Sequence, residues 1–519
     1  LEIIRSFQKP ENYVCRWLGY DRAAIDEKGL RGNLWHLIFN RMDGALYYYM
    51  DRYSPLGYPD GTPNNKAIWL ADEMARVKQG GLARLLNTAE PLHDGIAVHY
   101  SQSSIHLATR DGFRGDHAGL QTFNDNLAGV LAMLADLGLR YNFVSYEQIE
   151  TGTLEEENYR VLILPFSQAI SKDEAAAIER FVQNGGLLIA DVRPAITDEH
   201  GFEFKHGLLD HVFGVKRSEN CELLLNSGAI RIEQSHKIDL PPQITAQLGE
   251  TGLTSVSAKA LAKFDGSDNA AVWMNQFGQG KALLLNYLLT DYVKSKSVVD
   301  DLDDPDQVAS ARLGSTAIRD FYNGLLKNQG ITPPVTISGQ NDLPPCSVYR
   351  FGGNEAVEYV GILPVHSTPG EIQKPDPATV RFPDKGYVYD VRDKIAHGFT
   401  DEIQTGIAAG MPKLFAIMKY DVEGIEIEAP KRVKQGELLR FSARLNISGD
   451  STPADHVLLI EMTGPDGKQI SSYQKDIIAK KGKLLHQIPV ALNEAKGIRT
   501  LTVIDVITNK RAVHQLTVK

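Results

Sequence analysis

The sequence predicts a multidomain protein of mixed class, with α/β structure over about the first two thirds of the chain and β structure over the rest. Strand-like and helix-like segments alternate along most of the chain, a pattern typical of parallel strands joined by crossover helices. After Pro334 helical patterns almost disappear, and short alternating strands with turn sequences replace them. Because 519 residues exceed one ordinary hydrophobic core, we expect two to four domains.

The composition is that of a globular protein, with 43% hydrophobic and 23% charged residues. A net charge of -10 and the lack of a dense basic run disfavour nucleic acid as a partner, because phosphate binding requires clustered Lys and Arg. The longest apolar runs are far shorter than the roughly 20 residues that a membrane-spanning helix needs. The sequence therefore predicts neither a nucleic-acid partner nor a membrane span.

The sequence also predicts no metal site and no cofactor. Three cysteines, Cys15, Cys221 and Cys346, are widely separated and lack CxxC or Cys/His spacing. They match neither a disulfide framework nor a standard zinc site. The histidines are scattered, without an HExxH motif, and are expected to be structural or to lie at the surface.

The first 90 residues hold two predicted strands, Tyr13–Leu18 and Ala45–Met50, and helices at about Leu30–Arg41 and Ile68–Leu86. Two parallel strands are too few to bury both faces of a sheet. The chain starts at Leu1 without Met and without the pattern of a signal peptide. We therefore expect a processed protein or a fragment whose original N-terminus lies upstream.

The alternation restarts at residue 91 and predicts a doubly wound, flavodoxin-like sheet. Ser171 is a predicted helix N-cap, with Glu174 at the third helical position. A hairpin is expected to turn at Phe277–Gly280, and a helix to run from about Gln307 to Gln329. The predicted strands are Ile96–Ser101, Tyr141–Tyr146, Val161–Pro165 and Leu187–Asp191.

The last third of the chain is predicted to hold two β domains. Strand-like stretches within residues 336–422 indicate a small β domain. Residues 423–519 show short alternating strands separated by turns such as Gly464–Gly467. That spacing is typical of an immunoglobulin-like β-sandwich.

Five segments in the middle of the chain resemble, in their order and pattern, the trimerisation domain of glycoside hydrolase family 42 β-galactosidases. This domain is built like a class I glutamine amidotransferase. The resemblance covers about Pro91–Gln329 and implies a homo-oligomer, with a trimer favoured. The segments are IAVHYSQSS (Ile96–Ser104), NDNLAGVLAMLADLG (Asn124–Gly138), YNFVSYEQIETG (Tyr141–Gly152), YRVLILPFSQAISKDEAAAIERFVQNGGLLIADVRPAITDEHG (Tyr159–Gly201) and AVWMNQFGQGKALLLNY (Ala271–Tyr287).

The same resemblance also assigns the first residues of the chain to a domain. In these glycosidases an (α/β)8 barrel immediately precedes the trimerisation domain. WHLIFNRMDGALYYYM (Trp35–Met50) resembles the last helix and strand of that barrel, and YVCRWLGYD (Tyr13–Asp21) resembles the strand before it. The resemblance implies that residues 1–90 are the last βα units of a TIM-type barrel and that residues 91–335 are the amidotransferase-like domain.

Candidate substrate-binding residues follow from this placement at the C-terminal mouth of a barrel. Trp17, Tyr20 and Tyr48 would stack on a sugar, and Asp21 and Asp51 would accept hydrogen bonds from its hydroxyl groups. Packing in the core and at the barrel rim is the alternative interpretation of these residues.

Retaining glycosidases need two carboxyl groups about 5 Å apart, and in this family both belong to glutamates. The two aspartates at the predicted strand ends do not match. No catalytic residue is therefore assigned, and the glutamate pair is expected outside this sequence.

Amidotransferase chemistry is not expected. It would need a nucleophilic cysteine on a sharp turn between a strand and a helix. The predicted strand ends carry Phe166-Ser167 and Asp191-Val192 instead, and Ser167 lacks a GxSxG motif. The fold is therefore expected to serve assembly.

The predicted function is that of the C-terminal portion of a glycoside hydrolase with a carbohydrate substrate, serving assembly and one wall of the sugar site. The alternatives are a non-catalytic structural or oligomerisation protein, and a carbohydrate-binding protein without hydrolysis. The terminal sandwich resembles those attached to extracytoplasmic bacterial proteins. That likeness favours an extracytoplasmic over a cytoplasmic location.

Overall fold

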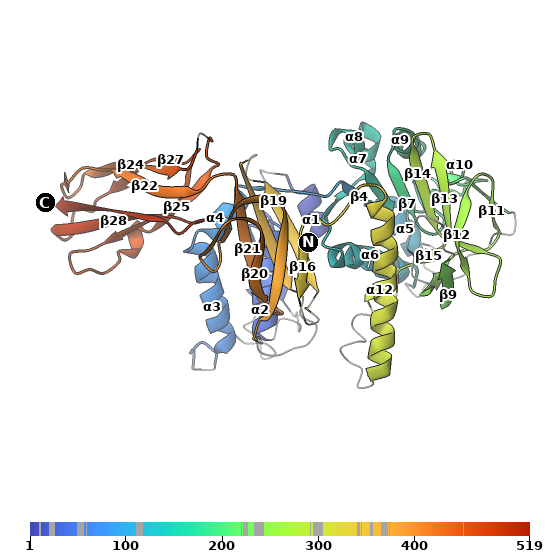
Figure 1. Ribbon diagram of the computed structural model, residues 1–519, viewed down its shortest axis with the longest axis horizontal. Coiled ribbons are helices and arrows are strands. Elements are labelled where there is room, and N and C mark those ends of the chain that lie inside the picture. The colour runs from blue at the N-terminus through green and yellow to red at the C-terminus, as the bar shows by residue number, and fades with distance from the viewer. Residues whose placement is uncertain are drawn as a thin grey trace. The chain divides into compact units, whose positions relative to one another are not determined.

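The protein is described here from a computed structural model (Figure 1). The chain divides into two compact units, which are treated separately. The terminal unit contains Leu1, Lys9–Leu92 and Pro334–Lys519, and the central unit contains Glu2–Gln8 and His93–Pro333. The structure describes residues 1–9, 12–19, 26–48, 57–58, 60–110, 118–218, 221, 227–232, 243–290, 292–293, 305–339, 343, 345–352, 356–364, 372, 374–449 and 451–519.

The terminal unit begins with two parallel strands and the helix between them. Strands β1 (Cys15–Gly19) and β2 (Gly44–Tyr48) pair directly. Helix α2 (Glu27–Phe39) starts where the side chain of Asp26 accepts a 2.8 Å hydrogen bond from the backbone N–H of Gly29. This N-cap satisfies one of the amide groups that a helix start leaves unpaired.

The single helix expected over Ile68–Leu86 is wrong, because the structure has two helices there. Helix α3 (Asn65–Lys78) and helix α4 (Leu82–Asn87) are separated at Gly81, whose φ is +75°. Glycine adopts this left-handed conformation without the steric cost that a side chain brings. The break therefore redirects the chain between the two helices.

Helix α2 packs its apolar face on a seven-stranded sheet. Trp35 and Phe39 are fully buried, and the Phe39 ring stacks on Tyr349 with 5.0 Å between ring centroids. A Cβ atom at Gly361 would lie 2.6 Å from the Phe39 ring, so the missing side chain allows the close approach. The strands follow the order β16 (Thr336–Gly339), β19 (Asp376–Asp390), β21 (Lys413–Met418), β18 (Val357–Pro364), β17 (Cys346–Gly352) and β3 (Glu90–Pro91), with β20 (Ile395–Ile407) paired to β19.

The end of the chain forms two facing sheets of three and five strands (Figure 1). Burial alternates along β24, where Leu439, Phe441, Ala443 and Leu445 point inward and their neighbours outward. This period of two is typical of sheets with one buried face. The sheets are β22 (Val422–Glu428), β24 (Leu438–Ile447) and β27 (Lys483–Pro489), and β23 (Arg432–Val433), β29 (Arg511–Val518), β28 (Gly497–Asp505), β25 (His456–Thr463) and β26 (Lys475–Ala479).

The central unit is built on a ten-stranded sheet. Its parallel half has the spatial order β14-β7-β6-β4-β5. In order along the chain this is 2-1-3-4-5, the strand order of flavodoxin-like sheets. The parallel strands are β4 (Ile96–His99), β5 (Tyr141–Val144), β6 (Val161–Leu164), β7 (Leu187–Ala190) and β14 (Gly280–Leu285), and the others are β13 (Ala270–Phe277), β12 (Lys259–Phe264), β9 (Ser227–Ile232), β10 (Gln243–Leu248) and β15 (Tyr287–Leu288).

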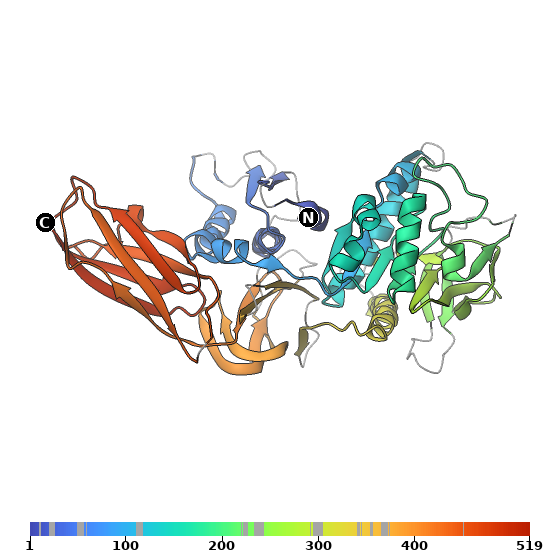
Figure 2. The ribbon, with the colours of Figure 1, turned by 90° about the horizontal axis from the view of Figure 1, so that it is seen from above.

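Helices cover this sheet, and two local predictions for it are confirmed. Ser171 and Glu174 form a reciprocal capping box at the start of α9 (Lys172–Gln183). The hairpin turns between Phe277 and Gly280. Helix α12, yellow in Figure 1, is seen along its axis in Figure 2. The helices include α5 (Gln102–Arg110), α6 (Ala118–Asp136), α7 (Tyr146–Thr151), α8 (Thr153–Glu156), α9 and α12 (Pro305–Lys327).

The short helix α1 (Glu2–Phe7) belongs to the central unit, although it stands among the first residues of the chain. It lies along β5, an edge strand. Arg5 donates a 2.6 Å hydrogen bond to the backbone oxygen of Tyr141, and the Ser6 hydroxyl accepts one of 2.9 Å from the N–H of Phe143. Since unpaired edge groups invite pairing with other chains, α1 protects this edge.

The mixture of α/β and β parts predicted from the sequence is confirmed. Among the described residues, no helix is both long and apolar enough to cross a membrane.

Candidate functional site

Strands β1 and β2 bring two of the predicted sugar-binding segments side by side. Their parallel register places Gly19 opposite Tyr48 and Trp17 opposite Leu46, so both strands end at the same edge. Trp17 and Tyr48 lie on these paired strands. The other three predicted residues, Tyr20, Asp21 and Asp51, lie outside the described residues.

A buried carboxylate supports the helices that follow these strands. Glu73 on α3 is fully buried, and it accepts hydrogen bonds from the Arg31 guanidinium and a 2.8 Å bond from the Trp35 indole N–H. Arg392, which follows β19, donates three further bonds of 3.0–3.1 Å to the same carboxylate. Because these donors occupy both of its oxygens, Glu73 holds α2 and α3 in place and has no free position for a substrate.

The central unit contains the arrangement of side chains that most resembles catalytic machinery. His99 ends β4 and Ser167 follows β6, at the point where the strand order of a flavodoxin-like sheet reverses and ligands commonly bind. The His99 Nδ1 lies 3.0 Å from the Ser167 hydroxyl oxygen, and its Nε2 lies 2.9 Å from a carboxylate oxygen of Glu174. Serine, histidine and a carboxylate are the groups used in nucleophilic hydrolysis.

This cluster is buried from solvent. Ser167, His99 and Glu174 are only 1%, 2% and 3% exposed. The second Glu174 oxygen accepts a 3.1 Å bond from the N–H of Ser171 as part of the capping box. The His99 Nε2 and the Glu174 carboxylate oxygen lie 2.9 Å apart but lack hydrogen-bond geometry. The two side chains are therefore in close contact without a hydrogen bond between them. At this exposure the Ser167 hydroxyl is not accessible to a substrate.

The strained residue at the end of β6 is Phe166, which has a φ of +48°. In hydrolases with a nucleophile on a strand-to-helix turn, the nucleophile itself occupies such a strained position. Here an aromatic side chain occupies it, 3% exposed and packed with Phe123 and Val192. The turn thus contributes to the core.

Asp191 connects the strand ends through hydrogen bonds. It follows β7 and accepts 2.6 Å hydrogen bonds from the N–H of Phe166 and from the amide of Asn126. Asn126 in turn accepts a 2.7 Å bond from the N–H of Leu289. Burial raises the pKa of Asp191 to about 7, although both hydrogen bonds favour the ionised form.

The three cysteines are free thiols. Burial raises the pKa of Cys221 to about 11 and that of Cys346 to about 12. Since the thiolate is the reactive form, these two groups are poor nucleophiles at neutral pH. Within the described parts of the chain, no group of three or more His, Cys, Asp or Glu side chains is arranged to hold a metal ion.

The sequence analysis did not predict the His99–Ser167–Glu174 cluster or the hydrogen bonds that Asp191 makes at the strand ends. It placed Ser167 and Asp191 at strand ends and identified the Ser171–Glu174 cap. The missing step was the contact of His99 with Ser167, which lies 68 residues away and has no motif around it. The predicted topology could have supplied that step, because the ends of neighbouring parallel strands meet at one edge.

Comparison with known proteins identifies the middle of the chain. Residues 131–331 match the family model of the β-galactosidase trimerisation domain. The sequence has no match among the curated proteins.

Solved structures share the fold over most of the chain. The β-galactosidase from Bacillus circulans sp. alkalophilus is 15% identical, with a TM-score of 0.56, and the match covers 79% of this chain and 54% of that one. The β-galactosidase from Rahnella sp. R3 and a catalytic mutant of Gan42B, a family 42 β-galactosidase from G. stearothermophilus, are both 16% identical, with TM-scores of 0.53. Each of these two matches covers 76% of this chain and 51% of the other.

The chain spans about half the length of these structures. The predicted resemblance to the C-terminal part of family 42 β-galactosidases is confirmed.

Proposed function

We propose that this chain is the C-terminal part of a glycoside hydrolase of the β-galactosidase type, in which it serves assembly and forms one wall of the sugar site. The match of residues 131–331 to the trimerisation-domain model carries this proposal. The fold likeness to family 42 β-galactosidases supports it. The burial of Ser167, His99 and Glu174 agrees with a central unit that serves assembly, because a buried serine is not accessible to a substrate.

The proposed architecture has four parts. Residues 1–90 are the last βα units of a TIM-type barrel, supported by the parallel pair β1 and β2 with α2 between them. Residues 91–335 are the amidotransferase-like domain, supported by its 2-1-3-4-5 strand order. Residues 336–422 are a small β domain, and residues 423–519 are an immunoglobulin-like sandwich.

The proposed sugar-binding wall lies where β1 and β2 end. Functional residues of TIM-type barrels gather at the C-terminal ends of the strands. Trp17, Tyr20 and Tyr48 would offer aromatic faces to the sugar ring, and Asp21 and Asp51 would accept hydrogen bonds from its hydroxyl groups. The wall orients the sugar and excludes water from one side of it.

The chemistry would be hydrolysis of a β-glycosidic bond by two carboxyl groups. One protonates the leaving oxygen, and the other attacks the anomeric carbon to form a glycosyl-enzyme, which water then hydrolyses. Glu73 and Glu174 are buried and held by other side chains, so neither suits these roles. We propose that the pair lies in a part of the protein outside this sequence.

Kinetics with an aryl β-galactoside test the proposal. The isolated 519 residues should show no turnover above the uncatalysed rate. A longer form of the protein with the complete barrel should hydrolyse the same substrate. Turnover by the isolated chain would contradict the proposed location of the catalytic pair, and an inactive longer form would contradict the proposed activity.

A further inference from the structure

A pocket of about 480 Å³ opens in the central unit at the N-terminal ends of β6 and β7. This volume lies within the range of small-molecule sites. Arg160 and Gly186 directly precede these two strands, and both line the pocket. The pocket is thus at the opposite end of the strands from the buried cluster around Ser167, and nothing above assigns it a role.

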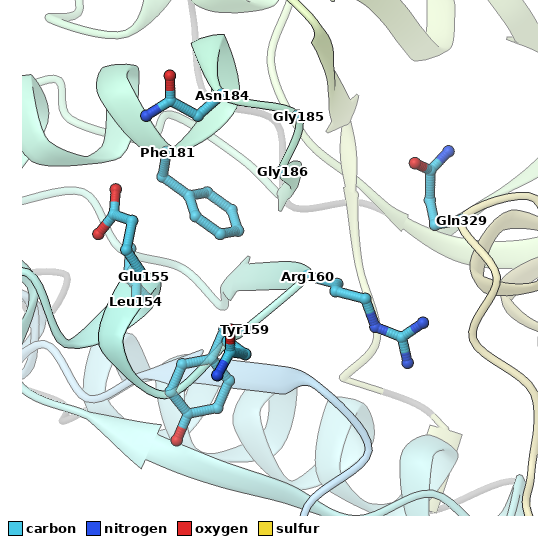
Figure 3. A pocket seen from close by; sticks show the side chains of 10 residues that line it. Leu154, Glu155, Tyr159, Arg160, Phe181, Asn184, Gly185, Gly186 and Gln329 are labelled. Atoms are coloured by element: carbon cyan, nitrogen blue, oxygen red, sulfur yellow. The ribbon is translucent and has the colours of Figure 1, made fainter.

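Polar side chains line this pocket from several elements. Glu155 comes from α8, Asn158 precedes β6, Asn184 ends α9 and Gln329 follows α12. Within the described part of the chain, none of these four side chains makes a hydrogen bond or ion pair. Figure 3 shows Asn184 and Glu155 on one side and Gln329 on the other, with the Phe181 ring between them. The described lining thus includes three amides and a carboxylate, which together carry both donors and acceptors.

The charges around the pocket disfavour an anion. Among the described residues of the lining, Arg160 is the one cation, and it already donates bonds of 3.0 Å to the backbone oxygen of Gly330 and 3.3 Å to that of Asp94. Glu155 is negative, and the C-terminal ends of α9 and α12 add the negative ends of two helix dipoles. These groups suit a neutral ligand that donates hydroxyl hydrogen bonds.

Two residues in the lining have a positive φ. Asn158 follows the C-cap of α8 with a φ of +55°, a left-handed conformation that asparagine adopts more readily than most residues and that commonly ends helices. Gly185 has a φ of +112°, and a Cβ atom there would meet no other atom within 4 Å. These two residues thus end α8 and α9 beside the pocket.

From this geometry we propose that the pocket is a carbohydrate site, separate from the wall at β1 and β2, that takes a neutral mono- or disaccharide. Amide side chains satisfy sugar hydroxyl groups because each amide both donates and accepts hydrogen bonds. The proposal does not depend on the proposed hydrolase activity.

Binding of lactose and D-galactose, measured by isothermal titration calorimetry and saturation-transfer NMR, tests the pocket. The measurements use the full chain and the variant Trp17→Ala, which weakens the proposed wall. We expect saturable binding that persists in Trp17→Ala. The double change Asn184→Ala with Gln329→Ala should weaken this binding at least about tenfold, since it removes two hydrogen-bonding groups.

The matched control is Gln515→Ala, an exposed amide on β29, which should leave the affinity unchanged. Circular dichroism checks that each variant is folded. No saturable binding, or equal affinity in the double variant and the unchanged chain, would overturn the pocket proposal. Complete loss in Trp17→Ala would assign the binding to the wall instead. If the anion glucuronate binds with the same affinity as the neutral sugars, the proposal that the ligand is neutral is wrong.

Discussion

At the scale of single residues, buried carboxylates hold this protein together. Glu73 and Asp191 each connect elements that are distant in the sequence, through hydrogen bonds that leave no oxygen without a partner. A buried charge is costly unless it is paired. Removing Glu73, which two guanidinium groups contact, should therefore destabilise the fold more than removing an exposed ion pair.

The change Glu73→Ala should lower the free energy of unfolding by about 3–5 kcal/mol, because it removes the buried carboxylate to which two guanidinium groups and an indole N–H donate. Urea denaturation measures this loss. The matched control is Glu27→Ala, which removes a partly exposed partner of the same Arg31. The control should cost less than about 1 kcal/mol, and equal losses would contradict the central role of Glu73.

Asp191 should make stability depend on pH. Its folded pKa of about 7 is above the ordinary value of 3.8, so the folded state keeps a proton that the unfolded chain loses. The contribution is fully present below pH 4 and is lost as pH rises to about 7. It amounts to at most about 4 kcal/mol at 1.36 kcal/mol per pKa unit.

Unfolding of the unchanged chain and of Asp191→Asn at several pH values checks this dependence. As pH rises from 4 to 7, the unchanged chain should lose stability relative to Asp191→Asn. Asp173→Asn, at the exposed start of α9, should show no such shift. A pH-independent difference for Asp191→Asn would rule out titration of this group.

At the scale of elements, close packing decides where α2 lies. The Phe39 ring occupies the space that a side chain at Gly361 would need. The change Gly361→Ala should therefore push α2 from the sheet and cost about 1–3 kcal/mol, as overpacking does. Thermal unfolding measures the loss.

Gly424→Ala is the control for this change, because Gly424 is also a strand glycine and a Cβ atom there would meet nothing within 4 Å. It should change stability little. If both variants lose the same stability, the cost comes from the strand backbone and the packing argument fails.

At the scale of the whole molecule, the chain alternates between two units. It leaves the central unit after Gln8, returns at His93 and leaves again after Pro333. In the terminal unit, one hydrophobic cluster joins Trp35 and Leu85 with Met418 and Leu458. The first 90 residues thus share their core with residues that follow Pro334.

We expect the chain to form a homotrimer, because residues 131–331 match a trimerisation domain. Light scattering coupled to size exclusion should give about three times the 57.3 kDa mass of one chain. A fall in the measured mass on dilution would show that the trimer dissociates. A monomer at every concentration would contradict the assembly role, and a stable dimer would contradict the trimer.

The sequence by itself determined the features that depend on neighbouring residues. The capping box at Ser171, the turn after Phe277 and the alternation of strands and helices all rest on signals within a few residues. It also carried the resemblance to the C-terminal part of family 42 β-galactosidases. The break at Gly81 was the local failure, because the adjacent glycines Gly80 and Gly81 are a turn signal that the single predicted helix ran across.

Only the tertiary structure decided the contacts between distant residues. It placed Glu73 against Arg392, 319 residues away, and His99 against Ser167, and it moved α1 into the central unit. Such pairs carry no local signal, because they form only when packed elements bring the side chains together. The hollow lined by Asn184 and Gln329 belongs to the same class, since its shape exists only between folded elements.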